Sequence, residues 1–107
     1  MFSKGDVVQF DFSPSQGHEP QGRRPALVVS TDCFNRGTSM TLVCPVTTVD
    51  NGFPLHRPLP KGLDVDGFVA LEQVRAFDLE VRHAQILARI EDQEFLAQIT
   101  ETLTSFF

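Results

Sequence analysis

Two adjacent arginines stand where the chain passes from a loop into a buried strand, and their side chains are well suited to bind an anion. Arg23 and Arg24 follow Gly22 and precede Pro25. A residue before proline is pushed into an extended conformation, so we expect the Arg24 guanidinium to leave a stiff backbone. Its planar fork of donors matches two phosphate oxygens. The alternative is a surface arginine in a minor salt bridge.

Metal chemistry is not indicated by the cysteines and histidines. Cys33 and Cys44 form no Cys-x-x-Cys pair, and His18, His56 and His83 are scattered along the chain, so no group has the spacing of metal ligands. Each cysteine lies in or beside an apolar segment. We therefore expect two reduced, mostly buried thiols, no metal site and no cofactor.

Strands on both sides of the first loop must position the arginines. Residues 7–12 alternate in polarity, as a half-buried strand does. Its core face would carry Val8, Phe10 and Phe12, and its wetter face Val7, Gln9 and Asp11. Residues 13–22 form a loop long enough to have a function of its own. The apolar run from Ala26 to Ser30 predicts the second strand.

The rest of the chain predicts further short strands and one helix. Thr31 and Asp32 can cap a short helical turn that ends at Gly37. Strands are expected at residues 40–46, 54–59, 67–71, 73–77 and 81–90, with a possible kink at Glu72. Pro45 cannot donate to a ladder, so the strand should end, bulge or lie at an edge there.

The carboxyl-terminal segment changes to a helical period. An apolar stripe follows Asp92, a good N-cap, and would pack on the sheet; it consists of Phe95, Leu96, Ile99, Leu103 and Phe106. A row of short strands followed by one helix predicts a small, mostly antiparallel β-barrel or sandwich with an added helix. The length of 107 residues fits a single domain over residues 1–107.

The charge is unevenly distributed. Residues 1–62 carry six Lys/Arg and five Asp/Glu, a net charge of +1, whereas residues 63–107 carry three and nine, a net charge of −6. This excludes a generally basic nucleic-acid binder, so a polyanion would bind through a local patch in the first half. The sequence shows no apolar stretch long enough for a membrane span and no signal core, so we expect a cytoplasmic protein without membrane contact.

Taken in order, several motifs make the chain resemble the MazF/PemK toxins of bacterial toxin–antitoxin pairs. The motifs are Gly5–Val8, the stretch from Gly17 to Ser30, Pro45–Thr48, and the segment from Asp66 to Asp78 with its acid–Gln pair. The amphipathic carboxyl-terminal helix also fits. Each motif alone is weak, but together and in this order they are specific and cover nearly the whole chain.

The resemblance implies a homodimeric, metal-independent endoribonuclease on an SH3-like β-barrel, neutralised by a partner antitoxin. In such toxins an arginine before the proline and a threonine at the end of the third strand carry the chemistry, and they map onto Arg24 and Thr47. Thr48 competes with Thr47 for this role. The RNA 2′-OH would attack the adjacent phosphate, while Arg24 stabilises charge on the phosphoryl oxygens and Thr47 orients an oxygen.

The general base stays open, because either Glu19 or His18 could accept the 2′-OH proton. His18 matches a histidine of the PemK-like branch. That branch also has an arginine and an aspartate where this chain has Ala70 and Glu72, so the complete PemK-type set of residues is not present. Glu72 keeps the negative charge, and Ala70 keeps none.

Single-stranded RNA would bind along the loops at residues 13–21 and 48–55, which could contact unpaired bases. We expect RNA contacts from Arg23, Thr48, Phe53 and Gln73. The alternative function is that of the CcdB toxins, which share the fold and bind DNA gyrase without cleaving RNA. Those toxins use carboxyl-terminal residues that include a tryptophan, and this chain has no tryptophan.

Overall fold

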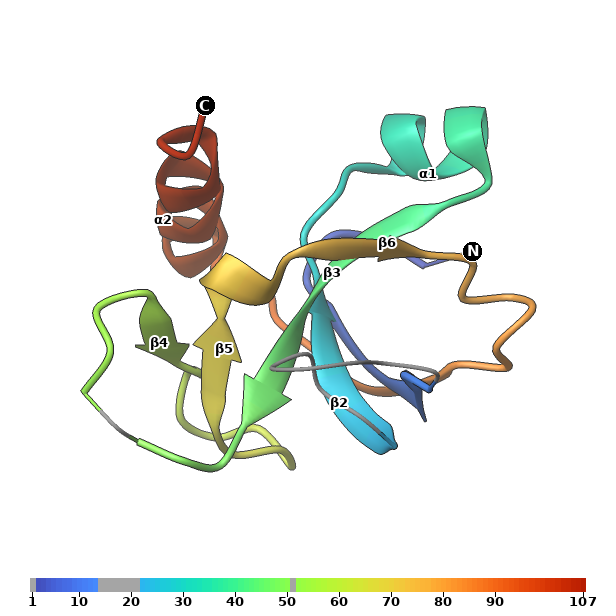
Figure 1. The fold of residues 1–107 in the computed structure, drawn as a ribbon. Coiled ribbons are helices and arrows are strands. Elements are labelled where there is room, and N and C mark those ends of the chain that lie inside the picture. Colours follow the sequence, from blue (N-terminus) through green and yellow to red (C-terminus); the bar gives the residue numbers. More distant parts are fainter. Residues whose placement is uncertain (1, 14–21, 51) are drawn as a thin grey trace.

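The computed structural model describes residues 2–13, 22–50 and 52–107, and within them an antiparallel sheet with two helices (Figure 1). The elements are β1 (Asp6–Asp11), β2 (Arg23–Val28), α1 (Asp32–Thr38), β3 (Thr41–Thr47), β4 (His56–Pro58), β5 (Phe68–Ala70), the 3₁₀ turn η1 (Leu71–Gln73), β6 (Arg75–Phe77), β7 (Gln85–Arg89) and α2 (Gln93–Thr104). The strand order is β4-β5-β3-β2-β1-β7, and β6 also pairs with β3. The mostly β fold with a carboxyl-terminal helix is confirmed, although β4 and β7 remain the ends of a sheet that does not close into a barrel.

The sheet has a hydrophobic core on each face. Val8, Phe10 and Phe12 enter one core, as the alternation of β1 predicts. The prediction that Val7 lies on a wetter face is wrong, because Val7 is fully buried in the other core. That second core includes Leu96 and Ile99 of α2, so the helix covers the face that the local pattern left open.

The strand β3 continues through Pro45 and ends at Thr47. The strand therefore does not end at Pro45, but the expected edge is present on one side of it. Pro45 pairs with Ala26 of β2, while on the other side β6 pairs with Thr41–Val43 and β5 pairs with Val46–Thr47, and neither of these ladders includes Pro45. Since the proline has no N–H to donate, it fits the gap between these two ladders.

The short helix α1 begins as predicted but ends later. Thr31 Oγ1 accepts the Phe34 N–H at 3.3 Å. The helix passes Gly37 and ends at Thr38, where Ser39 takes the left-handed cap conformation with φ of 60°. Cys33 is exposed on this helix, so the expectation of two buried thiols holds only for Cys44.

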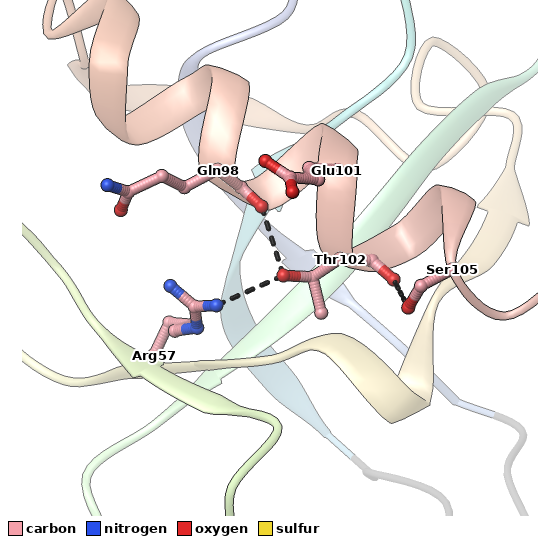
Figure 2. A pocket seen from close by; sticks show the side chains of 5 residues that line it. All are labelled: Arg57, Gln98, Glu101, Thr102 and Ser105. Atoms are coloured by element: carbon pink, nitrogen blue, oxygen red, sulfur yellow. Dashed lines mark hydrogen bonds between the residues drawn. The ribbon is translucent and has the colours of Figure 1, made fainter.

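The helix α2 is held at its start by the predicted cap and along its side by β4. Asp92 Oδ1 accepts the Phe95 N–H at 3.1 Å. Farther along, Arg57 Nη2 donates to Thr102 Oγ1 at 3.1 Å, and both residues line a cavity of about 420 Å³ (Figure 2). In the described part of the chain no helix is both long and apolar enough to cross a membrane.

Candidate functional site

The register of β2 and β3 places Arg24 and Thr47 on the same face of the sheet. Paired residues run from Val28–Val43 to Ala26–Pro45. β2 begins at Arg23 and β3 ends at Thr47, so both strands extend beyond the last pair. Arg24 lies two residues from Ala26, and Thr47 lies two residues from Pro45. Residues two positions apart on a strand share a face, so Arg24 and Thr47 face the same side as this last pair. Figure 1 shows β2 and β3 separating toward these two ends.

Both side chains lie at the boundary between core and solvent. Arg24 is half-buried and pairs with Phe10 of β1 on its other side. Thr47 is half-buried, and its Oγ1 accepts the Val49 N–H at 3.2 Å. A guanidinium and a hydroxyl at such a boundary can both reach a phosphate that lies along the surface of the sheet.

Thr48 and Arg23, the neighbours of these two residues, have different surroundings. Thr48 is exposed and lies one position after β3 ends. Arg23 is exposed and stands opposite Asp11. The pKa of the Asp11 carboxylate is lowered mainly by the Ser13 backbone N–H, then by the Ser13 hydroxyl, with smaller contributions from Arg82 and Arg23.

Thr47 is also fixed by Gly67, which precedes β5. A Cβ at Gly67 would lie 2.7 Å from the Thr47 carbonyl oxygen and 2.8 Å from Val46 Cγ1. Gly67 has φ of +142°, a conformation that residues with side chains rarely adopt. Only glycine allows the turn before β5 to approach the end of β3 this closely.

His18 and Glu19, the two predicted general bases, lie outside the described residues. The two ends of their loop are joined beside Arg24. Phe12 donates its N–H to the Gly22 carbonyl at 2.9 Å, and the Gly22 N–H donates to Ser13 Oγ at 3.3 Å. The loop therefore leaves and re-enters the sheet at the mouth of β2.

Phe53 and Gln73, two predicted RNA contacts, lie toward the β4–β5 end of the sheet. Phe53 is 44 % exposed, and its ring packs edge-on against His56, with ring centroids 5.3 Å apart. Gln73 is half-buried in η1. Ala70 is buried opposite His56, so this position offers no group for chemistry.

A hydrogen bond that the sequence did not reveal connects β4 to η1. His56 Nε2 lies 2.9 Å from Glu72 Oε2. No local pattern indicates this contact, because the two residues are sixteen positions apart. The Glu72 charge also acts on Cys44: burial, and after it Glu72, raises the pKa of this thiol to about 12.

Two arginines from the acidic second half add positive charge near the site. Arg75 and Arg82 each stand over the Phe77 ring, at 4.9 Å and 4.8 Å from its centre. Arg75 pairs with Val43, which shares a face of β3 with Thr47. Arg82 Nη1 donates to the carbonyls of Asp11 and Ser13, at 2.7 Å and 2.9 Å. The prediction that a polyanion binds through residues 1–62 leaves out these two arginines.

Metal ligands do not gather in the described ranges, where no group of three or more His, Cys, Asp or Glu side chains could hold an ion. The charged side chains around the candidate site are Arg24, Arg75 and Arg82, together with Glu72, which contacts His56. Such a set can bind an oxyanion and stabilise developing negative charge.

Comparison with known proteins gives consistent matches over most of the chain. Residues 3–107 match the model of a family described as PemK-like, MazF-like toxin of type II toxin–antitoxin system. The endoribonuclease toxin ChpB of Escherichia coli K12 is 42 % identical over 98 residues, covering 86 % of this chain and 83 % of ChpB. The endoribonuclease toxin MazF of the same strain is 34 % identical over 90 residues, covering 84 % and 80 %.

Solved structures show the same fold. MazF from Deinococcus radiodurans superposes with a TM-score of 0.88 at 37 % identity, covering 98 % of this chain and 94 % of that one. A MazE–MazF complex from the same organism gives a TM-score of 0.83 at 35 % identity, again covering 98 % and 94 %.

Proposed function

This chain belongs to the PemK-like, MazF-like toxins of type II toxin–antitoxin systems, and we propose that it is an endoribonuclease toxin that cleaves single-stranded RNA. The observation that carries the proposal is the β2–β3 register, which sets Arg24 and Thr47 on one face of the sheet, each two residues beyond the last pair, Ala26–Pro45. Cleavage of messenger RNA would stop translation and growth. A cognate antitoxin would neutralise the enzyme, as MazE–MazF complexes suggest.

The chemistry follows from the two side chains. The RNA 2′-oxygen forms a bond to the adjacent phosphorus, and the bond from phosphorus to the 5′-oxygen breaks. Arg24 stabilises the charge that develops on the phosphoryl oxygens, since a guanidinium is always protonated and donates in a planar fork. Thr47 donates a hydrogen bond to a phosphate oxygen or to the leaving oxygen. The proton of the 2′-OH passes to a base, for which Glu19 and His18 stay the candidates, and the 5′-oxygen takes up a proton.

The gyrase-binding alternative is not favoured. The similar proteins are named endoribonucleases, and the paired arginine and threonine suit phosphate chemistry. Arg23, Thr48, Phe53 and Gln73 remain candidates for RNA contacts around the cleavage point.

A second copy of the chain is the expected partner in the active form. An apolar groove of about 430 Å³ lies between the end of α2 and the edge formed by β3 and β6. Leu42, Val74 and Leu103 line it together with Phe107, whose side chain is fully exposed in the single chain. A symmetric dimer over this groove would cover Phe107, and twofold pairing is the commonest form of self-association.

The test is cleavage of a mixed single-stranded RNA by the wild-type protein and by Arg24→Ala, Thr47→Ala and Arg23→Ala. Removing one charge-stabilising donor typically lowers the rate by about 10²–10³-fold, which we expect for the first two variants. Arg23→Ala is the matched control: its side chain points to the other side of the strand, so binding weakens only modestly and in a salt-dependent way.

Thermal melts of all variants should stay close to wild type, because Arg24 and Thr47 are half-buried at strand ends. Cleavage should persist in excess EDTA and leave 2′,3′-cyclic phosphate ends, and RNA with 2′-deoxy sugars should stay intact. Activity that is lost in EDTA and restored by Mg²⁺ would overturn the mechanism. Normal cleavage by all three variants would refute the assignment of Arg24 and Thr47.

A further inference from the structure

His56 contains a buried nitrogen that lacks a hydrogen-bond partner within the described part of the chain. The side chain is 11 % exposed, and its Nε2 contacts Glu72 Oε2 at 2.9 Å. The other ring nitrogen, Nδ1, is buried and finds no partner among the residues that the structure describes. Most buried polar side-chain atoms in native proteins have a partner, and leaving one unpaired is costly. This position therefore offers a hydrogen-bonding atom to a ligand.

Glu72 determines which kind of group Nδ1 can bind. An ionised carboxylate only accepts hydrogen bonds, so in the neutral form of the imidazole Nε2 carries the ring proton. Nδ1 then has a lone pair and accepts. Its missing partner is an N–H donor.

His56 lies on the same face of the sheet as the candidate catalytic pair. His56 pairs with Ala70, while Phe68, two positions earlier on β5, pairs with Thr47. Residues two positions apart on a strand share a face. His56 and Thr47 thus face the same side, about 12 Å apart by the ordinary spacing of strands and residues. This distance is too long for contact with the reacting phosphate but suits a flanking nucleotide.

Phe53 adds an aromatic surface next to the imidazole. Its ring is nearly perpendicular to that of His56, at 87°, and 44 % of the residue is exposed. Proteins that read single-stranded RNA stack unpaired bases on aromatic rings and bind their edges by hydrogen bonds. An exposed ring beside an available acceptor provides both interactions.

We propose that Phe53 and His56 form a base-binding subsite, in which Phe53 turns to stack on an unpaired base and His56 Nδ1 accepts an N–H from its edge. Glu72 is the positioning residue that fixes the imidazole tautomer. The subsite rests on the proposed function, because it selects the nucleotide beside the bond that Arg24 and Thr47 break. The subsite is separate from Arg24 and Thr47, since neither Phe53 nor His56 contacts the reacting atoms.

The central variant is His56→Gln, whose amide can still reach Glu72 but has no atom at the Nδ1 position. His83→Asn is the matched control, since His83 is exposed at φ of 54°, a conformation that asparagine tolerates. Each protein cleaves a single-stranded RNA library of random sequence, and sequencing of the new ends gives the base preference at every position. We expect His56→Gln to lose roughly five- to tenfold of the preference at one position flanking the cut. His83→Asn should keep the wild-type preference.

A binding measurement on the wild-type protein does not depend on catalysis. The ¹⁵N resonances of the His56 ring are followed while 2′-O-methyl octamers of A, C, G or U are added. At least one octamer should shift Nδ1, and Glu72→Gln should abolish the single-tautomer signature of the free ring. A wild-type enzyme that cleaves RNA, with His56→Gln keeping the same preference, would refute the subsite alone. A protein that cleaves no RNA but shows the Nδ1 shift would refute the proposed catalysis and keep the subsite. An Nδ1 resonance that none of the four octamers shifts would overturn the subsite.

Discussion

Replacing Gly67 by alanine should disturb the fold and the candidate site together. The new Cβ would lie 2.7 Å from the Thr47 carbonyl oxygen and 2.8 Å from Val46 Cγ1, distances that real Cβ atoms essentially never show. The carbonyl belongs to the backbone of β3 and cannot rotate away as a flexible side chain could. The residue would also be held at φ of +142°, where a side chain is strained.

Gly62 separates these two effects. It has φ of +91°, but a Cβ added there would have no described atom within 4 Å, so Gly62→Ala suffers conformational strain without a clash. Strain of this kind costs about 1–3 kcal/mol, partly offset by about 0.4–1 kcal/mol from the less flexible unfolded chain. Overpacking at Gly67 should add about 1–3 kcal/mol. We therefore expect Gly62→Ala to lose about 1 kcal/mol and Gly67→Ala about 3 kcal/mol or more.

Urea and thermal unfolding measure the difference. For a domain of this size 1 kcal/mol corresponds to about 4–8 °C, so Gly67→Ala should melt at least about 10 °C below Gly62→Ala. At a temperature where both variants are folded, Gly67→Ala should also cleave RNA about 10–100-fold more slowly, because Thr47 must shift. If the two variants melt together and cleave equally, the close approach of Gly67 to β3 does not constrain the site.

Three other perturbations follow from the described contacts. Asn35 accepts a hydrogen bond from the Ser30 hydroxyl and donates one to the Phe2 carbonyl. Asn35→Ala should therefore lower the free energy of unfolding, measured in urea, by about 2 kcal/mol. An unchanged urea midpoint would contradict a structural role for this network. Phe107→Asp should shift the proposed dimer to monomer in analytical ultracentrifugation without lowering the monomer's stability, because the side chain is fully exposed in the single chain. A variant that stays dimeric would place the interface elsewhere. At pH 8, iodoacetamide should modify the exposed Cys33 but not Cys44, whose thiol stays protonated because burial raises its pKa to about 12. Mass spectrometry of the native protein measures both sites, and modification of Cys44 before Cys33 would contradict this prediction.

Several features that depend on neighbours in sequence were predicted correctly. The alternation of residues 7–12 gave the core face of β1, and the spacing after Asp92 gave α2 with its cap. The kink expected at Glu72 is the turn η1. The error at Val7 has a different origin: this residue is buried by a helix almost ninety positions later, and no local period contains that information.

The candidate site shows the same division. The residue types around Arg24 suggested phosphate binding, and the family resemblance suggested Thr47. Neither of them indicated that the two residues share a face, because this depends on the register between strands that are joined through α1. The contact of His56 with Glu72 likewise depends on the pairing of β4 with β5. A side chain that looks ordinary in the sequence gains its chemical partner only when the strands are aligned.

The period of two along β3 links stability to the proposed chemistry. Cys44 and Val46 enter the core under α2, whereas Val43 and the last residue, Thr47, face the other way. A slip of one residue between β2 and β3 would move the first pair out of the core under α2 and turn Thr47 to the face opposite Arg24. The packing of α2 on the sheet therefore selects the register on which the proposed catalytic pair depends. For this reason a destabilising change in the α2 core should lower cleavage only through the folded fraction, whereas a change at Gly67 should lower it in the folded protein as well.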